Sequence, residues 1–483
     1  MTDRKAAATH RLRRWTGRFA AAGLAALAPL PAPAQAPALE PPASRYQPLP
    51  RRDLLLTGAT ILDGAGGRLT GDILVRDGRI AAVGPRLPRP EGVEIVAADG
   101  RWITPGLIDI HTHYGTYLLP QTRGEAEVSD VIESSDPNVA DTWIEHAVRP
   151  ADPAFSHALR SGVTTLQILP GSGALFGGRS VVVHPVPAVT LAQMRFPGAP
   201  QGLKMACGGN PASSFGGRGR APNSRQGEIA LIRRTLIDAQ RLAGRRAAHR
   251  RSDGDRGRQG RRGRRDGGGP PGGHERDLRL ETLADAIEGR LPVHLHCYRA
   301  EDIATWIEVL GEFGLRVAAV HHATEAYKIA PLLADAGVCA AVWPDWWGFK
   351  REAEDGIREN AAFVDAAGGC AILHSDIPVL GSLLNIEAAK AAAAGRRAGL
   401  DIPPERAIRW ITSNPAGTLG LGDRIGRLAP GFNADLVVWS GDPFSIYSRA
   451  DLVLIDGAVA HDRANPSPRN VPDFELGREG AWQ

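Results

Sequence analysis

Strand-like and helix-like segments alternate regularly from residue 291 to residue 394, and this alternation admits few architectures. Repeated strand–helix units predict a parallel sheet. The expected strands end in His, Asp or Cys and read "LPVHLHC", "LRVAAVHH", "VCAAVWPD" and "GCAILHSD". The expected helices cover residues 302–313, 325–337, 357–366 and 383–394. Because the chemistry of a (β/α)8 barrel lies at the carboxyl ends of its strands, this pattern predicts an α/β fold with a TIM-type barrel.

The segment "ITPGLIDIHTHYG", residues 103–115, places two histidines at the end of one expected strand. Thr104-Pro105-Gly106 has the composition of a turn, and the apolar run 107–110 fits a buried strand. His111 and His113 follow, and residues i and i+2 of a strand point to the same face. Two imidazoles on one face can hold one metal ion from the same side. Two unrelated histidines are the alternative.

Other expected strands also end in residues that bind metals. In a closed barrel these ends converge, and imidazole with carboxylate suits zinc, iron or manganese. We therefore expect one centre with one or two divalent ions, and we favour zinc. From the residues alone its members are His111, His113, Lys204, one of His294 and His296, one of His321 and His322, and Asp376.

Short strands with Asp-Gly and Gly-Gly turns flank the expected barrel on both sides. They predict a small β-sandwich domain built from both ends of the mature chain, with no catalytic residue types gathered in it. The expected boundaries are a signal peptide at 1–36, a Pro-rich linker at 37–52, β-domain parts at 53–104 and 424–465, the barrel at 105–423, and a tail at 466–483.

The N-terminal segment has the plan of a secretory signal peptide, with basic residues, a short apolar run and the small-residue site Ala34-Gln35-Ala36. We therefore expect an exported protein, periplasmic or secreted, with no membrane span after cleavage. Arg13-Arg14 leaves the general and the twin-arginine export routes both open, and a disordered tail is the alternative interpretation.

The net charge of +4 is local, because residues 1–36 carry +5 and residues 245–276 carry +7, which leaves −8 on the rest of the chain. The isoelectric point therefore gives no evidence for nucleic-acid binding. Residues 244–273 are rich in Arg and Gly and are expected to be disordered. They are interpreted as an out-of-frame stretch, a solvated loop or an RNA-binding tract, in that order of preference.

The four cysteines, Cys207, Cys297, Cys339 and Cys370, form no Cys-x-x-Cys pair. Three of them lie in or beside expected strands, so buried free thiols are favoured. Their spacing leaves disulfides open.

Several segments resemble the amidohydrolase superfamily, closest to its imidazolonepropionase-like and Xaa-Pro dipeptidase-like members. "PGLIDIHTH" is similar to the first-strand signature, "LHSDIPV" to the eighth-strand segment with Asp376, and "TSNPAGTLGLGDRIGRLAPGFNADLVVW" to the closing segment. "VHLHCYRAEDI" resembles the fifth-strand pattern and implies His296 rather than His294. "HATEAYK" resembles the sixth-strand motif and implies His322 rather than His321.

The resemblance is weaker at the fourth strand. "LKMACGG" is similar to the version in which a carboxylated lysine, here Lys204, bridges two metals; a plain strand lysine is the alternative. Relatives tend to have a Glu and a basic residue around "GENPK", where this chain reads Gly208-Gly209-Asn210-Pro211-Ala212. This departure concerns the substrate contacts and leaves the metal centre unaffected.

The resemblance implies hydrolysis of a non-peptide or dipeptide-like C–N bond by metal-activated hydroxide. The implied catalytic residues are Asp376 as base and then acid, with His322 and His296 polarising the carbonyl. A small-molecule substrate is expected, with no nucleic-acid partner, and a homo-oligomer stays open. A non-catalytic metal- or small-molecule-binding protein on the same barrel is the alternative. The candidate substrate contacts follow expected strand ends and are Tyr114, Tyr298, Arg299, Lys328, Asp345 and Trp346.

Overall fold

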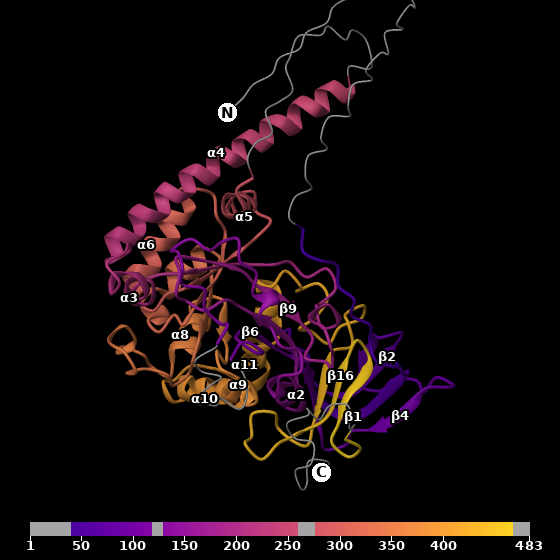
Figure 1. Cartoon of the computed structure of the whole chain (residues 1–483). Helices are drawn as coiled ribbons and strands as arrows, with labels where there is room; N and C mark the ends of the chain where they lie inside the picture. The colour runs from indigo at the N-terminus through magenta and orange to yellow at the C-terminus, as the bar shows by residue number, and fades with distance from the viewer. Residues whose placement is uncertain (1–39, 118–128, 259–275, 467–483) are drawn as a thin grey trace, which may run out of the picture. The chain divides into compact units, whose positions relative to one another are not determined.

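The computed structural model describes residues 40–117, 129–258 and 276–466 (Figure 1). The predicted signal peptide, residues 259–273 of the Arg/Gly-rich segment and residues 467–483 of the predicted tail lie outside the described residues. Within the described residues, no helix combines the length and the apolar character that crossing a membrane requires.

Both ends of the described chain contribute to one eight-stranded sheet, as the sequence predicts. Its order is β17-β16-β15-β5-β1-β2-β3, and β4 pairs with β1. Figure 1 shows the indigo strands β1 and β2 near the yellow strand β16. A two-layer sandwich is not confirmed, because these strands form one sheet. Their bounds are β1 Leu54–Leu62, β2 Arg68–Arg76, β3 Arg79–Gly84, β4 Glu94–Ala97, β5 Trp102–Pro105, β15 Leu436–Trp439, β16 Ala450–Ile455 and β17 Ala458–Asp462.

The expected barrel strands form two further sheets. The six-stranded sheet has the order β14-β13-β12-β11-β10-β8, and all its neighbours are parallel except β10 and β8. Its bounds are β8 Phe176–Arg179, β10 Leu203–Ala206, β11 Val293–His296, β12 Val317–His321, β13 Cys339–Val342 and β14 Ala371–Leu373. The three-stranded sheet has the order β6-β7-β9, with β6 Leu107–Thr112, β7 Val163–Ile168 and β9 Val181–Val183.

The two sheets are linked at both sides without forming one continuous ladder. Only Ser180 separates β8 from β9. At the other side, Thr112 and Asp376 form an isolated parallel bridge. The α/β class with parallel strands is thus present, whereas the hydrogen-bonded ladders form two separate sheets instead of one continuous closed barrel.

Helices connect the parallel strands at the positions expected after residue 300, except that the helix expected at 325–337 is divided into a 3-10 turn and a short helix. The α-helices are α2 Pro153–Arg160, α3 Gly209–Gly216, α4 Arg225–Arg258, α5 Leu278–Ile287, α6 Ala300–Gly311, α7 Ala330–Asp335, α8 Asn360–Ala366, α9 Pro378–Gly381, α10 Leu384–Arg397, α11 Pro404–Ala407 and α12 Ser413–Thr418. The 3-10 helices are η1 Ile144–His146, η2 Leu191–Gln193, η3 Ala326–Ile329, η4 Arg351–Ala353 and η5 Ile408–Ile411.

Helix α4 corrects the expectation of disorder for the first part of the Arg/Gly-rich segment. The helix continues past residue 244 to Arg258. Arginine and alanine are good helix formers, and each glycine in a helix costs only about 1 kcal/mol. Arg246 also ties this part of the helix to α5, because its guanidinium lies 3.0 Å from the Asp285 carboxylate.

The four cysteines are paired, which corrects the preference for free thiols. Cys207 is bonded to Cys297, and Cys339 to Cys370, with Cα–Cα distances of 5.3 and 4.5 Å. Each bond joins residues in or next to neighbouring strands, β10 with β11 and β13 with β14. Strand adjacency brought these thiols together, and sequence spacing does not reveal it.

Candidate metal centre

His111 and His113 lie at the carboxyl end of β6 and are almost completely buried. The Nδ1 atom of His113 lies 2.7 Å from the carbonyl oxygen of Leu169, so Nδ1 carries the proton and donates it there. This contact leaves Nε2 of His113 free of a proton, which is the form that binds a metal.

Asp376 meets both histidines from the segment that follows β14, on the other side of the sheet junction. Its Oδ1 atom lies 3.4 Å from Nε2 of His111 and 3.3 Å from Nε2 of His113. The backbone N–H of Asp376 also donates to the carbonyl oxygen of His111 at 2.9 Å. The carboxylate is therefore fixed at the end of β6 by its own backbone.

Two of these strand ends have strained backbones. His322 has φ +61° and Asp376 has φ +68°, in the left-handed region that non-glycine residues rarely adopt. Such conformations cost about 1–3 kcal/mol each and are concentrated at functional sites. The turn directs His322 toward the same point, where its Nε2 lies 4.0 Å from Oδ1 of Asp376.

His296 and Lys204 complete the group from β11 and β10. The His296 ring lies 4.7 Å from the His322 ring, centroid to centroid. Lys204 is fully buried, and its Nζ atom lies 3.4 Å from Nε2 of His111. All six residues predicted from the sequence as ligands are thus brought together at strand ends.

Burial sets the charge of these groups. It lowers the pKa of His111, His296 and His322 well below the usual range, and the charge of Lys204 contributes to each shift. It lowers the pKa of Lys204 to about 7. Burial alone would raise the pKa of Asp376. The hydrogen bond and charge that His113 provides in its protonated form, before a metal is bound, act together with the charges of His374 and Lys204; they outweigh burial and hold that pKa below its usual value. Neutral imidazoles and an ionised carboxylate are the forms that coordinate metals.

The donor set fits a divalent metal. Within the described residues, both ring nitrogens of His296 and the Nδ1 atoms of His111 and His322 are buried without a hydrogen-bond partner. Buried polar atoms normally find partners, since an unmet one costs about 1–3 kcal/mol. Imidazole and carboxylate donors of this kind bind zinc, iron or manganese.

His294 and His321 correct another expectation, namely that they point away into the barrel wall or the helix layer. His294 pairs with Lys204, and His321 with His296, so they face the same side as those residues. Nδ1 of His294 lies 2.9 Å from Nε2 of His321. The i, i+2 spacing of His294 and His296 already implied a shared face, and the prediction overlooked it.

The six candidate substrate contacts separate into two groups: three lie at the centre, against Trp343 or at a cavity, and three are engaged elsewhere. Tyr298 lies at the centre, with its ring 4.7 Å from that of His296. Trp346 packs on Trp343, with ring centroids 5.4 Å apart, and Arg299 lines a cavity of about 560 Å³ at the α3–α4 side.

Three other candidates are engaged elsewhere. Tyr114 has no exposed surface and packs on Phe155 in the core. Lys328 is bound at the surface by Asp355, 2.6 Å away. Asp345 lies 2.9 Å from Nζ of Lys390. Position after a strand end did not distinguish these residues from those that reach the centre.

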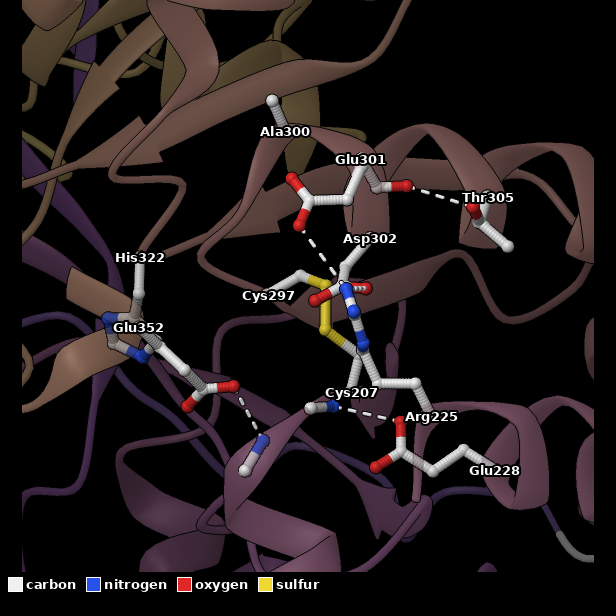
Figure 2. The surroundings of a disulfide bond; sticks show 12 residues. Cys207, Arg225, Glu228, Cys297, Ala300, Glu301, Asp302, Thr305, His322 and Glu352 are labelled. Atoms are coloured by element: carbon white, nitrogen blue, oxygen red, sulfur yellow. Dashed lines mark hydrogen bonds and ion pairs between the residues drawn. A yellow bond between two sulfur atoms is a disulfide. The ribbon is translucent and has the colours of Figure 1, made fainter. Parts of the chain in front are cut away.

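The Cys207–Cys297 bond lies beside the centre, directly after β10 and β11 (Figure 2). Next to it, the backbone N–H of Gly208 donates to Glu228 Oε2 at 2.9 Å, and that of Gly209 donates to Glu352 Oε1 at 2.6 Å. A Cβ atom at Gly209 would lie 2.6 Å from Glu352 Oε2, so the glycine leaves room for that carboxylate. Glu352 is thus a carboxylate at this loop that the sequence did not predict.

Sequence reasoning also missed His374 and Trp343. His374 is fully buried, and its ring lies 5.0 Å from the His111 ring. The Trp343 ring stacks on His322 at 4.3 Å. The signal for His374 was its i, i+2 spacing to Asp376, the same spacing that marked His111 and His113.

A crystal structure of an amidohydrolase from Thermotoga maritima MSB8 is similar to this chain over the whole length of the Thermotoga protein. It shares 31% identity and a TM-score of 0.73, covering 85% of this chain and 100% of that one. The chain belongs to the amidohydrolase superfamily. Within it, the profile of the Amidohydrolase family matches residues 270–461.

Two curated amidohydrolase-type relatives are similar in sequence. Amidohydrolase tasK of Hapsidospora irregularis is 32% identical over an alignment of 417 residues that covers 81% of this chain and 40% of that protein. An imidazolonepropionase of Ralstonia nicotianae is 36% identical over 133 residues, 25% of this chain and 33% of that protein. The chain thus spans less than half the length of these curated relatives.

Proposed function

We propose that this amidohydrolase-superfamily protein is a metal-dependent hydrolase that cleaves a non-peptide or dipeptide-like C–N bond. One observation carries the proposal. Nε2 of His111 and Nε2 of His113 lie within 3.4 Å of Oδ1 of Asp376, at a meeting point of strand ends. Family membership supports hydrolysis, and this geometry supports a metal as its agent.

The residues that would hold one or two ions are those predicted from the sequence: His111, His113, Lys204, His296, His322 and Asp376. When bound, a divalent ion supplies hydroxide near neutral pH and polarises a carbonyl oxygen. We favour zinc, because neutral imidazoles and a carboxylate are its ordinary ligands among N and O donors. Lys204 would join two ions after its amine has added CO2, and burial favours the neutral amine that this addition needs.

Asp376 would move the proton in this reaction. Its carboxylate, held unprotonated near neutral pH, takes the proton of the attacking water and returns it to the leaving nitrogen. His296 and His322 lie on the side of Tyr298, and as residues that would hold the ion they would help to polarise a substrate carbonyl on that side as charge develops on its oxygen.

The same proposal extends to architecture and location. The links at Ser180 and at Thr112–Asp376 support a TIM-type barrel formed by the two smaller sheets, with the β-domain parts at 53–104 and 424–465. Two disulfides support export, since such bonds persist in oxidising compartments and are rare in the cytosol.

Metal analysis combined with turnover tests the function. The purified chain should contain zinc, iron or manganese, and it should hydrolyse a member of a panel of N-acyl amino acids, dipeptides and lactams. Chelation should abolish turnover, and the divalent ion should restore it. Metal binding without turnover of any member would favour a binding protein on the same fold. A chain that binds no divalent ion would overturn the proposal.

A further inference from the structure

We propose that His374 is a further metal ligand and that His111, His322 and His374 form a three-imidazole group within this centre. The inference rests on the proposed function, because it concerns the same metal centre. It goes beyond that function by adding a ligand that sequence reasoning did not identify.

The three side chains lie close enough to share one ion. One ring nitrogen from each of His111, His322 and His374 lies within 4.8 Å of the other two, and all three residues are buried. Zinc–nitrogen bonds are about 2.0–2.1 Å long, so two ligand atoms of one ion lie within about 4.2 Å of each other. Small side-chain adjustments on binding would bring the observed spacing into this range.

His374 has buried ring nitrogens that are available to a metal ion, which would satisfy one of them. Within the described residues, both of its ring nitrogens are buried without a partner, a property that it shares with His296. His184 differs from it by one partner, since its Nδ1 atom is held 2.8 Å from the carbonyl oxygen of Thr164 and its Nε2 atom alone has none in the part of the chain that the structure describes. A histidine kept only for packing would leave two polar atoms unmet, at about 1–3 kcal/mol each.

The neighbours of His374 hold its ring in place and exclude water. Trp343 lies over the site, with its ring centroid 5.1 Å from His374 and 4.3 Å from His322. The indole is 6% exposed and covers both imidazoles on that side. Packing against Trp343 thus fixes the orientation of the His374 ring.

This group differs in charge from the second one in the centre. His111, His113 and Asp376 also form a trio within ligand distance, and that trio includes a carboxylate. The group with His374 contains imidazoles only. Because these ligands are neutral, the ion together with them would keep the full charge of a divalent ion. Because His111 belongs to both trios, loss of His374 should weaken metal binding without removing the carboxylate site.

Metal affinity measured on two variants tests the proposal. His374→Ala removes the imidazole, and His374→Gln keeps a polar side chain that can still orient a neighbour by hydrogen bonding. Removing a residue that only orients a ligand typically costs 10–100-fold in affinity. We expect both variants to lose more than about 100-fold in zinc affinity, and the visible spectrum of the cobalt-substituted protein to change. The matched control is His184→Gln, which changes a buried histidine outside both trios and should leave affinity and spectrum unchanged.

Unchanged zinc affinity and cobalt spectrum in folded His374→Gln would overturn the inference. If neither variant folds by circular dichroism, crystals of the zinc-loaded wild-type chain decide instead. An anomalous peak about 2.0–2.1 Å from a His374 nitrogen supports the proposal, and zinc without that contact overturns it. If the wild-type chain binds metal and hydrolyses substrate while the His374 variants keep the wild-type zinc affinity and cobalt spectrum, this inference alone is refuted. A wild-type chain without metal refutes the proposed function as well.

Discussion

The carboxylate of Asp376 lies 3.3 Å from the imidazole of His113, across the junction between the first and last strands of the expected barrel. The bridge between Thr112 and Asp376 at the same place sets this distance through the backbone. The contact therefore depends on sheet geometry as well as on the attraction between the two side chains.

Asp376→Asn should lower kcat by about 10²–10⁴-fold, since the amide keeps the size of the carboxylate but cannot accept and return a proton. Steady-state hydrolysis of the best substrate in the panel measures this change. Asp345→Asn is the control, because Asp345 is paired with Lys390 and should tolerate the change within a few-fold. Turnover of Asp376→Asn near that of the wild type would remove Asp376 from its proposed role.

Lys204→Gln should reduce the metal content per chain, because glutamine cannot add CO2 to form the proposed carboxylated ligand. In the wild type this addition needs a neutral amine, and burial lowers the pKa of Lys204 to about 7. Elemental analysis gives the metal content, and native mass spectrometry of the wild type should show the added mass of one CO2. Lys390→Gln, which changes a lysine in an outer ion pair, should leave both unchanged. Full metal content in Lys204→Gln would indicate a plain buried lysine.

Glu228→Gln should flatten the pH dependence of stability. Burial raises the pKa of Glu228 from its ordinary value of 4.5 to about 8. Its stabilising contribution is therefore fully present below about pH 4.5 and is lost as the pH rises toward 8. Urea unfolding at several pH values measures this slope, since a pKa difference of one between the folded and unfolded chains corresponds to about 1.4 kcal/mol. An unaltered slope in the variant would show that Glu228 ionises without cost in the folded chain.

Loss of the Cys207–Cys297 bond should cost more stability than loss of the Cys339–Cys370 bond. The first closes a loop with a sequence separation of 90 and the second one of 31. Loop-closure entropy then predicts losses of about 4–5 and about 3–4 kcal/mol in the free energy of unfolding. The paired Cys→Ala variants, compared by urea unfolding, measure the two values. The reverse order would indicate that residual structure in the unfolded chain outweighs loop length.

Gly381→Ala should destabilise the chain, because a Cβ at Gly381 would overlap the hydroxyl oxygen of Tyr114. Tyr114→Phe removes that oxygen and should restore part of the loss, because Cζ of the ring would still lie 2.7 Å from the added Cβ. Overpacking typically costs about 1–3 kcal/mol, and a double-mutant cycle of thermal unfolding reports the coupling. Additive effects of the two substitutions would contradict this contact.

The metal centre was predictable from the sequence where spacing alone fixes geometry. His111 and His113 share a face because a strand has a period of two. Parallel strands then bring His322 and Asp376 to the same edge. His374 has the same i, i+2 spacing to Asp376 but lies just past the end of β14, and it was missed because the eighth-strand resemblance marks Asp376 alone.

Other features depend on contacts that no local pattern contains. The pairing of Cys339 with Cys370 follows from the adjacency of β13 and β14. The burial of Tyr114 follows from its packing on Phe155. The helical continuation of α4 past residue 244 shows that arginine-rich composition alone does not predict disorder.

The position of β5 between β1 and β15 has a consequence for synthesis of the chain. Trp102 pairs with Trp439, so β5 has an unpaired edge until the ribosome has made β15, more than 300 residues later in the chain. Such an edge is open to pairing with another chain. Nascent copies on one messenger would thus be exposed to mispairing, and a holding chaperone or delayed folding would protect them until β15 emerges.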